Sequence, residues 1–306
     1  MKKVSIISPV YNEVGNIFLF YDTLKQVISS LKYDHEIIFV NDGSVDGTSE
    51  LLNELAAKDK TIKIVEFSRN FGHQAAITAG MDFSNGDCTI ILDSDMQDPP
   101  SVIKDLLVEW EKGYEVVNAK RRSRMDSPLK LFTAKAFYKI LNLLIEYKLP
   151  ENVGDFRLLD KKVIETLRDL PEKNRYLRGL AVWVGFKQIT IEFDRQARYS
   201  GQTHYSLKNM LGLAFDAIFS FSKLPMRLAL FTAICFMLVS IAVLVYAVIS
   251  VLLGHVVAGW ASTLFIFSFL SSLQMIVLAV ILEYVGRIYT QVQGRPIYIV
   301  SETVNF

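Results

Sequence analysis

Short apolar runs alternate with amphipathic stretches from the N-terminus to about residue 120. Runs bounded by turn residues predict buried strands at Val4–Val10, Glu36–Val40, Ile62–Phe67, Cys88–Leu92 and Tyr114–Ala119. Stretches with helical spacing predict the intervening helices at Asn16–Leu31, Ser49–Lys58, Gln74–Phe83 and Val102–Lys112. This alternation predicts an α/β fold, a doubly wound and mostly parallel sheet with helices on both faces.

Two longer apolar runs follow, at about 228–253 and 260–282, and no charged residue lies between Arg227 and Glu283. Each run exceeds the ~20 residues that a helix needs to cross a bilayer, so we expect two membrane-spanning helices. Buried core helices are the alternative, which the length of the uncharged stretches disfavours. The predicted organisation is a domain at 1–224, a membrane hairpin at 225–290 and a tail at 291–306.

Basic residues flank the two apolar runs and are absent from the loop between them. Lys208, Lys223 and Arg227 precede the first run, and Arg287 and Arg295 follow the second. The positive-inside rule therefore predicts a protein integral to the plasma (inner) membrane, with both termini and the large domain in the cytoplasm.

Composition excludes several classes of protein. Hydrophobic residues make up 51% of the 306 residues and charged residues 21%, which excludes a disordered chain. The formal net charge of +1 indicates no polyanionic partner such as a nucleic acid. The two cysteines, Cys88 and Cys235, exclude a disulfide scaffold and a cysteine-based zinc cluster.

Polar residues follow four of the predicted strands. Because the carboxyl ends of parallel strands open on one edge of a sheet, we expect these loops to form one ligand site. Turn chemistry is the alternative for any single loop, and Asp46-Gly47 is interpreted in that way. The four loops are Pro9–Glu13, Asn41–Ser44, Ser68–His73 and Asp93–Asp98.

Asp93 and Asp95 lie two residues apart directly after the fourth predicted strand. Both carboxylates can there reach one divalent cation, Mg²⁺ or Mn²⁺, whose other ligands would come from substrate phosphates. A solvated acidic turn is the alternative. The sequence has no Walker phosphate loop and no G-x-G-x-x-G after a strand, which argues against a P-loop NTPase and a nicotinamide-binding enzyme. The pattern favours a nucleoside diphosphate bound through a metal.

Five motifs occur in order: Val4–Glu13 (VSIISPVYNE), Val40–Gly47 (VNDGSVDG), Arg69–Gln74 (RNFGHQ), Leu92–Pro100 (LDSDMQDPP) and Gly154–Leu158 (GDFRL). Together they resemble family 2 glycosyltransferases with the GT-A fold. The nearest branch is that of the polyprenyl-phosphate glycosyltransferases, which includes dolichol-phosphate mannose synthases and bactoprenol glucosyltransferases. The resemblance covers essentially the whole chain. It implies inverting transfer of one sugar, with glucose from UDP-glucose favoured, to undecaprenyl phosphate or a similar polyprenyl phosphate.

The resemblance also implies roles for individual residues. Expected donor-binding residues are Pro9, Tyr11, Glu13, Asp42, Asp93, Ser94 and Gln97. Expected metal ligands are Asp93, Asp95 and Gln97. Asp155 resembles the family's catalytic base, and Asp155 and Asp95 are the expected catalytic residues. A phosphate monoester is mostly dianionic at pH 7 and scarcely needs a base, so Asp155 could instead orient the acceptor, hold Arg157 or form a structural salt bridge.

Basic residues are expected at the acceptor phosphate, because guanidinium groups bind phosphate bidentately. The segment 198–205 (RYSGQTHY) is similar to the family's R-x-x-G-x-[ST]-[KH]-Y loop, which closes over the phosphates. Its His204 stands where many members have lysine, which makes the charge there pH-dependent. The candidates for the acceptor phosphate are Arg122, Arg124, Arg178, Arg198 and His204.

The stretch 120–139 carries seven basic residues and one acidic residue, and apolar residues recur in it at helical spacing. Such a pattern predicts an amphipathic helix on an anionic membrane surface, near 127–147, and a similar stretch predicts a second near 206–222. A core-facing stripe with a solvated basic face is the alternative. We expect no nucleic-acid partner, because a membrane anchor follows in the same chain.

Several alternatives stay open at this point. The donor could be GDP-mannose or an aminoarabinose derivative, and a non-catalytic nucleotide-sugar sensor is a third interpretation. A processive synthase is disfavoured, since only two spans are predicted and no Q-x-x-R-W segment is present. Self-association as a homo-oligomer is plausible. His35, His73 and His255 are interpreted as structural or solvated, and Glu283 is expected to pair with Arg287 four residues on.

Overall fold

The computed structural model describes residues 1–122, 153–173, 175–194, 219, 222, 224–253 and 259–306. The chain divides into two compact units. The first comprises Met1–Leu143, Tyr147–Ala217 and Pro296–Phe306, and the second comprises Leu144–Glu146 and Ile218–Arg295. The last eleven residues of the chain therefore belong to the unit that contains its beginning.

All five strands predicted from apolar runs form, with ends that differ by at most two residues. They are β1 (Lys3–Val10), β2 (Asp34–Asn41), β3 (Ile62–Phe67), β4 (Cys88–Ile91) and β5 (Val116–Arg121). The predicted helices form as well, as α1 (Val14–Ile28), α2 (Thr48–Lys58), α3 (His73–Phe83) and α4 (Ile103–Glu111), the last after a 3₁₀ turn at Pro100–Val102. Further along lie β6 (Val153–Asp160), α6 (Lys161–Asp169), α7 (Leu177–Trp183), β7 (Gln188–Phe193) and β8 (Val300–Val304).

Within the described residues these strands form one sheet of eight, in the order β7-β5-β6-β4-β1-β2-β3-β8. β4, β1, β2 and β3 run parallel to one another, as do β5 and β7. β6 runs antiparallel to β4 and β5, and β8 runs antiparallel to β3. The doubly wound, mostly parallel sheet expected from the sequence is confirmed, with two antiparallel strands that the alternation of strands and helices did not reveal.

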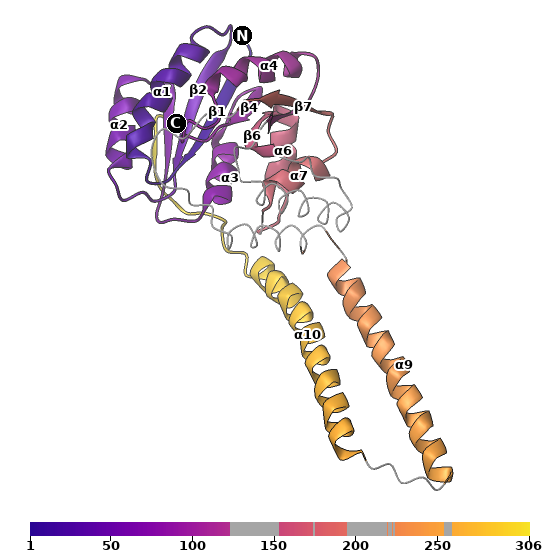
Figure 1. Cartoon of the computed structure of the whole chain (residues 1–306). Coiled ribbons are helices and arrows are strands. Elements are labelled where there is room, and N and C mark those ends of the chain that lie inside the picture. The colour runs from indigo at the N-terminus through magenta and orange to yellow at the C-terminus, as the bar shows by residue number, and fades with distance from the viewer. Residues whose placement is uncertain (123–152, 174, 195–218, 220–221, 223, 254–258) are drawn as a thin grey trace. The chain divides into compact units, whose positions relative to one another are not determined.

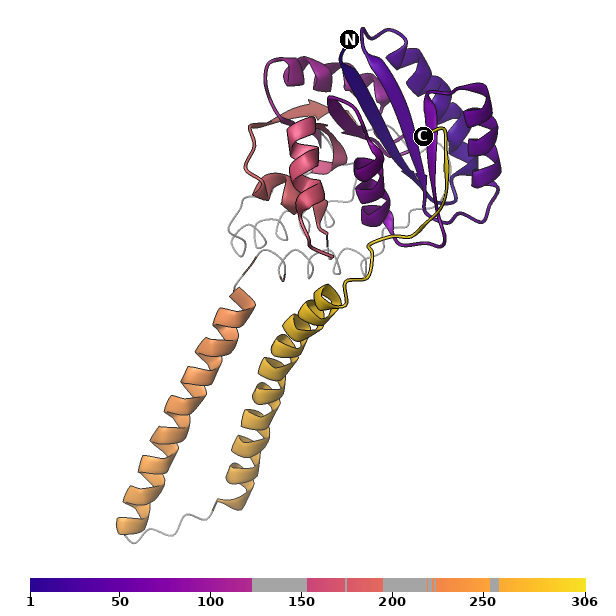
Figure 2. The same cartoon turned by 180° about the vertical axis from the view of Figure 1, so that it is seen from behind.

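The apolar strands are buried on both faces. Successive side chains of a strand point to opposite faces, so Ile6 and Ile7 of β1 serve different layers. Ile6 belongs to the core that contains Ile17 and Phe20 of α1. A Cβ atom on Gly80 of α3 would lie 2.2 Å from the Ile7 side chain, so glycine is what lets α3 pack this closely against the other face. Figures 1 and 2 show helices on both faces of the sheet.

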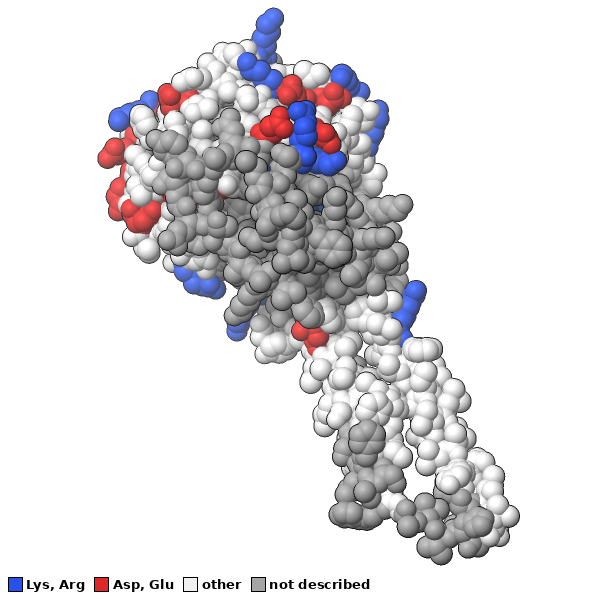
Figure 3. Space-filling model, in the orientation of Figure 1, with Lys and Arg blue, Asp and Glu red and all other residues white. Residues whose placement is uncertain are grey.

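The second unit contains two long helices, α9 (Leu224–Leu252) and α10 (Trp260–Val292). The segments Leu224–Val243 and Phe269–Val292 have mean hydropathies of 2.2 and 1.8, and neither is buried. Figure 3 shows almost no charge on these helices. They are long and apolar enough to cross a membrane, and their exposure argues against buried core helices.

α10 extends ten residues beyond the predicted span, which ended at residue 282. This extension contains Glu283 and Arg287, the first charged residues after Arg227. Arg287 Nε donates to Glu283 Oε1 at 2.8 Å, which confirms the ion pair predicted between residues four apart. Tyr284, between them, packs its ring 5.3 Å from that of Phe219 and donates its hydroxyl hydrogen to the Ser222 carbonyl at 3.3 Å. These contacts connect α10 to the segment that leads into α9.

Candidate active site

The candidate site lies at the carboxyl edge of the sheet, where the strand order reverses. β1 pairs with β2 on one side and with β4 on the other, and such a switch point leaves a crevice beyond the strand ends. Pro9 is buried in β1, and Tyr11, which follows that strand, is 41% exposed. Asp93 and Asp95 follow β4. Residues expected at a nucleotide donor therefore lie at the carboxyl ends of both strands, on either side of the switch point.

Asp42 connects the loops that follow β2 and β3. Its Oδ1 accepts a hydrogen bond from the Phe71 amide at 2.6 Å and its Oδ2 accepts one from the Gly72 amide at 2.9 Å. Burial raises the pKa of Asp42, and the two amides act in the opposite direction. The next residue, Gly43, has φ +70°, and a Cβ atom there would lie 2.6 Å from the Arg69 carbonyl carbon. Glycine thus permits the close approach of the two loops that Asp42 holds together.

Three other expected donor residues form local contacts or are buried. Glu13 accepts a hydrogen bond from the Asn16 side-chain amide at the start of α1. The Gln97 backbone amide donates to Asp95 Oδ1 at 3.0 Å, which closes the turn after β4. Ser94 is only 3% exposed. The structure therefore gives Glu13 and Asp95 a role in shaping these turns.

Asp155 reaches the same edge because β6 is antiparallel to β4. Ile91 of β4 pairs with Arg157 of β6. Continuing this antiparallel register by two residues places Asp155 opposite Asp93. Asp155 is 7% exposed and receives two hydrogen bonds from Arg178 of α7, from Nε at 2.9 Å and from Nη2 at 2.8 Å. Burial alone would raise the pKa of Asp155, but Arg178, with a smaller contribution from His73, holds it well below its usual range.

His73, interpreted from the sequence as structural or solvated, lies between the two aspartates. Its Nε2 is 3.6 Å from Asp93 Oδ1 and 3.5 Å from Asp155 Oδ2. Partial burial of the imidazole, whose side chain is 45% exposed, opposes its protonation, but the two carboxylates outweigh that effect and raise the pKa of His73 to about 9. Its place in the polar loop after β3 was the one sequence signal that could have identified it.

Asp93 has the features of a cation ligand. Its Oδ1 is buried and has no hydrogen-bond partner among the described residues. Burial raises the pKa of Asp93 to about 6, with His73 acting in the opposite direction. Among the described residues no group of three or more His, Cys, Asp or Glu side chains is arranged to hold a metal. A cation at this position would therefore take one or two carboxylates and further oxygen ligands from elsewhere, the arrangement that Mg²⁺ commonly adopts with substrate phosphates.

A second ion pair, not identified from the sequence, fixes the far end of the same loop. Asp98 is 1% exposed and accepts hydrogen bonds from Arg121 Nε at 3.2 Å and Nη2 at 3.1 Å. Arg121 ends β5, and a Cβ atom on Gly154 would lie 3.4 Å from its Nη2 atom. The Asp93–Asp98 loop is thus held against β5 and β6.

The residues expected at the acceptor phosphate separate into three groups. Arg178 is at the site, paired with Asp155. Arg122 is exposed at the end of β5, with its Nη1 3.1 Å from Asp194 Oδ2. Arg124, Arg198 and His204 lie outside the described residues, as do the helices expected near 127–147 and most of 206–222.

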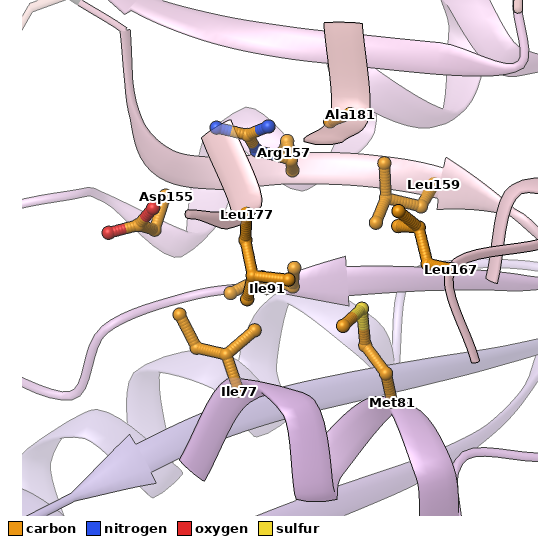
Figure 4. Close-up of a pocket in the computed structure, with 9 residues that line it drawn as sticks. All are labelled: Ile77, Met81, Ile91, Asp155, Arg157, Leu159, Leu167, Leu177 and Ala181. Carbon is orange, nitrogen blue, oxygen red and sulfur yellow. The ribbon is translucent and has the colours of Figure 1, made fainter. Parts of the chain in front are cut away.

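Beside Asp155 lies a small apolar cavity of about 10 Å³, room for about one water molecule. In Figure 4 the carboxylate oxygens of Asp155 point away from Leu159 and Leu167, two of the lining residues. Arg157, also at the cavity, is 3% exposed and donates to the Gly154 carbonyl at 2.8 Å. Asp155 therefore pairs with Arg178 in α7, and Arg157 bonds to backbone.

Comparison with known proteins identifies the family. The sequence pattern of glycosyl transferase family 2 matches residues 5–168. The chain belongs to this family. It is 42% identical over 302 residues to the uncharacterized glycosyltransferase sll0501 of Synechocystis sp., across 98% of this chain and 95% of that one. It is 39% identical over 303 residues to the prophage bactoprenol glucosyl transferase homolog of Escherichia coli, across 98% of each chain.

Among solved structures, the glycosyltransferase is similar to mannosyl-3-phosphoglycerate synthase from Rubrobacter xylanophilus. The two are 15% identical, the match covers 71% of this chain and 72% of that one, and the TM-score is 0.49.

The charges around His73 predict a pH-dependent stability in this glycosyltransferase. A pKa raised from 6.5 to about 9 means that the folded protein gains stability from protonated His73 below pH 6.5 and loses it as the pH rises through 9. The measured quantity is the melting temperature of the wild type minus that of His73→Gln, with both proteins in chelator. We expect this difference to decrease as the pH rises from 6.5 to 9. A difference that is constant or increases over this range would show that the two carboxylates do not stabilise the imidazolium.

Proposed function

We propose that the protein transfers one glucose from UDP-glucose to undecaprenyl phosphate, with inversion of the anomeric carbon. The observation that carries the proposal is the similarity to a protein named as a bactoprenol glucosyl transferase homolog, which extends over 98% of both chains and includes the two apolar helices. A soluble acceptor would not require those helices. The polar edge of the sheet supports the proposal, because its loops supply carboxylates on both sides of one crevice.

At the donor, Asp93, Asp95 and Gln97 are the residues that would hold Mg²⁺ or Mn²⁺ together with the diphosphate. A cation bound there would offset the negative charge that develops on the leaving nucleoside diphosphate. The buried Oδ1 of Asp93, which accepts no hydrogen bond from the described residues, supports this assignment. Pro9, Tyr11, Glu13 and Asp42, which lie at or just after the ends of β1 and β2, would contact the nucleoside.

At the acceptor, the phosphate oxygen itself attacks the anomeric carbon. A phosphate monoester is mostly dianionic at pH 7, so no strong base is required. The low pKa of Asp155 makes it a poor proton acceptor, and its two hydrogen bonds to Arg178 suit a positioning role. Arg178 and His73 then supply positive charge beside the two aspartates, where the acceptor and donor phosphates would approach each other. Arg122, Arg124, Arg198 and His204 are further candidates for contact with the acceptor.

The basic residues that flank the two apolar runs support an orientation with the sheet domain on the cytoplasmic side. In that orientation the donor, a cytoplasmic sugar nucleotide, and the lipid phosphate of the inner leaflet reach the same side of the membrane. A homo-oligomer would bring further apolar helices beside α9 and α10.

The test is a donor screen with the purified full-length protein and undecaprenyl phosphate in detergent. Radiolabelled UDP-glucose, GDP-mannose and an aminoarabinose nucleotide are compared for label that becomes extractable into organic solvent. We expect transfer from UDP-glucose, at one glucose per lipid. Transfer from another donor alone would change the assigned sugar, binding without transfer would indicate a sensor, and products with several sugars would indicate a processive enzyme.

A further inference from the structure

The last residues of the chain, 297–306, form what we call the strap, which follows α10 and runs along the outer edge of the sheet (Figure 2). Its strand β8 pairs with β3, and the Ser68 amide donates to the Ile299 carbonyl at 3.0 Å. The end of the strap is anchored independently. Asn305 Nδ2 donates to the Ile62 carbonyl at 2.8 Å, and the Phe306 ring lies 5.0 Å from that of Phe83.

Tyr298 lies beside the end of β3, next to Ile299, whose carbonyl accepts the hydrogen bond from Ser68. Its ring stacks on that of Phe67, with centroids 5.1 Å apart and planes 12° apart. Its hydroxyl donates to Asp82 Oδ2 of α3 at 2.8 Å. Phe67 is the last residue of β3 and is 3% exposed. Tyr298 thus packs against the end of the strand from which the loop Ser68–Gly72 leaves.

Phe67 in turn packs against Phe71, a residue of that loop whose backbone amide binds Asp42. The rings of Phe67 and Phe71 meet edge to face at 5.7 Å and 87°. The Arg69 guanidinium lies 3.9 Å from the centroid of Phe71. The Phe71 amide donates to Asp42 Oδ1. A continuous set of contacts therefore leads from Tyr298 through Phe67 and Phe71 to Asp42.

We infer that the strap positions the donor-binding loops, and that Tyr298 is the positioning residue through which it acts. This inference rests on the proposed function, since Asp42 is one of the residues assigned there to the nucleoside. Aromatic rings that meet edge to face or stack restrict each other's orientation, so loss of the Tyr298 ring frees Phe67 and, with it, the Phe71 loop. The loop amides then hold Asp42 less well, which weakens donor binding in the ground state and the transition state alike. Such a change raises KM and leaves kcat unaltered.

The experiment uses the full-length protein and measures the KM for UDP-glucose, kcat, the Kd for UDP-glucose and the melting temperature. We expect Tyr298→Ala to raise the KM and Kd about tenfold with kcat within about twofold, an effect of the size usual for coupled sites. Tyr298→Phe keeps the stack and is expected to behave like the wild type. Phe306→Ala, which loosens the strap away from Phe67, is the matched control and is expected to lower only the melting temperature.

Coupling is tested directly by combining Tyr298→Ala with Phe71→Leu. If the strap acts through Phe71, the double variant has a KM close to that of Phe71→Leu alone. Should Tyr298→Ala fail to fold, Tyr298→Leu, which keeps apolar bulk without a ring, replaces it with the same expectation.

The outcomes separate the inference from the proposed function. If the wild type binds UDP-glucose and the Tyr298→Ala variant has an unchanged Kd and KM, the inference is wrong and the proposed function is unaffected. The inference also falls if Phe306→Ala raises KM equally, since the strap would then act only through stability. A wild type that binds no sugar nucleotide overturns both.

Discussion

Changing Asp155 to Asn is expected to lower kcat for glucosyl transfer by about 10²- to 10³-fold, the usual loss when one preorganised electrostatic group is removed. Asp155 accepts two hydrogen bonds from Arg178 and lies 3.5 Å from His73 Nε2. The asparagine amide keeps the shape of the side chain but removes the negative charge that orients the Arg178 guanidinium and the protonated His73 imidazole. The measurement is single-turnover transfer to undecaprenyl phosphate, with Asp105→Asn, an exposed aspartate of α4, as the matched control.

Two further results distinguish positioning from base catalysis. Arg178→Gln is expected to cause a loss of similar size, and the double variant to be little worse than either single one, because the two side chains act as a unit. The acidic limb of the kcat–pH profile is expected to persist in Asp155→Asn, since the second ionisation of the acceptor phosphate near pH 6 governs it. Near-normal turnover of Asp155→Asn at pH 7.5 would exclude both roles.

Asp95→Ala is expected to lower kcat/KM for UDP-glucose by about 10³-fold, the scale of several kcal/mol that a metal contributes to charge stabilisation. Asp93→Asn is expected to have an effect of the same order, because the two carboxylates follow β4 two residues apart. Asp105→Ala serves as the control. Both site variants are expected to bind UDP-glucose with an affinity that no longer depends on added Mg²⁺. An Asp95→Ala variant whose donor binding still responds to Mg²⁺ would show that other residues hold the cation.

Much of this fold follows from local patterns. The strands β1 to β4 are apolar runs between turn residues, and their polar ends meet because parallel strands share a carboxyl edge. From sequence, Asp93, Asp95 and Asp42 could therefore be predicted to lie at one edge of the sheet. Their burial and pKa values could not, because these depend on packing between loops from different strands.

The partners of Asp155 needed the structure. Asp155 and Asp93 are 62 residues apart, and their apposition depends on β6 entering the sheet antiparallel to β4. The sequence of β6, VGDFRLLD, mixes apolar and charged residues without a clear alternation, so it reveals neither the direction nor the register of the strand. The pairing of Asp155 with Arg178 and its approach to His73 follow from that register, so the sequence, which indicated only a structural or solvated His73, could not reveal either contact.

The sequence also did not reveal that the strap belongs to the sheet. Its strand Val300–Val304 has the sequence VSETV, short and half polar, as edge strands often are. It follows a long apolar helix, so composition alone made residues 291–306 look like a tail. Its pairing with β3 and the stack of Tyr298 on Phe67, both seen in the structure, connect it to the candidate site.

In the proposed function, a divalent cation at Asp93 and Asp95 presents the sugar nucleotide to a lipid phosphate. The most direct test is transfer of labelled glucose from UDP-glucose to undecaprenyl phosphate by the purified full-length protein in excess EDTA, followed by titration with Mg²⁺ or Mn²⁺. We expect transfer to stop in EDTA and to return with either added cation in the wild type but not in Asp95→Ala. Equal rates with and without EDTA, and in Asp95→Ala, would contradict this expectation.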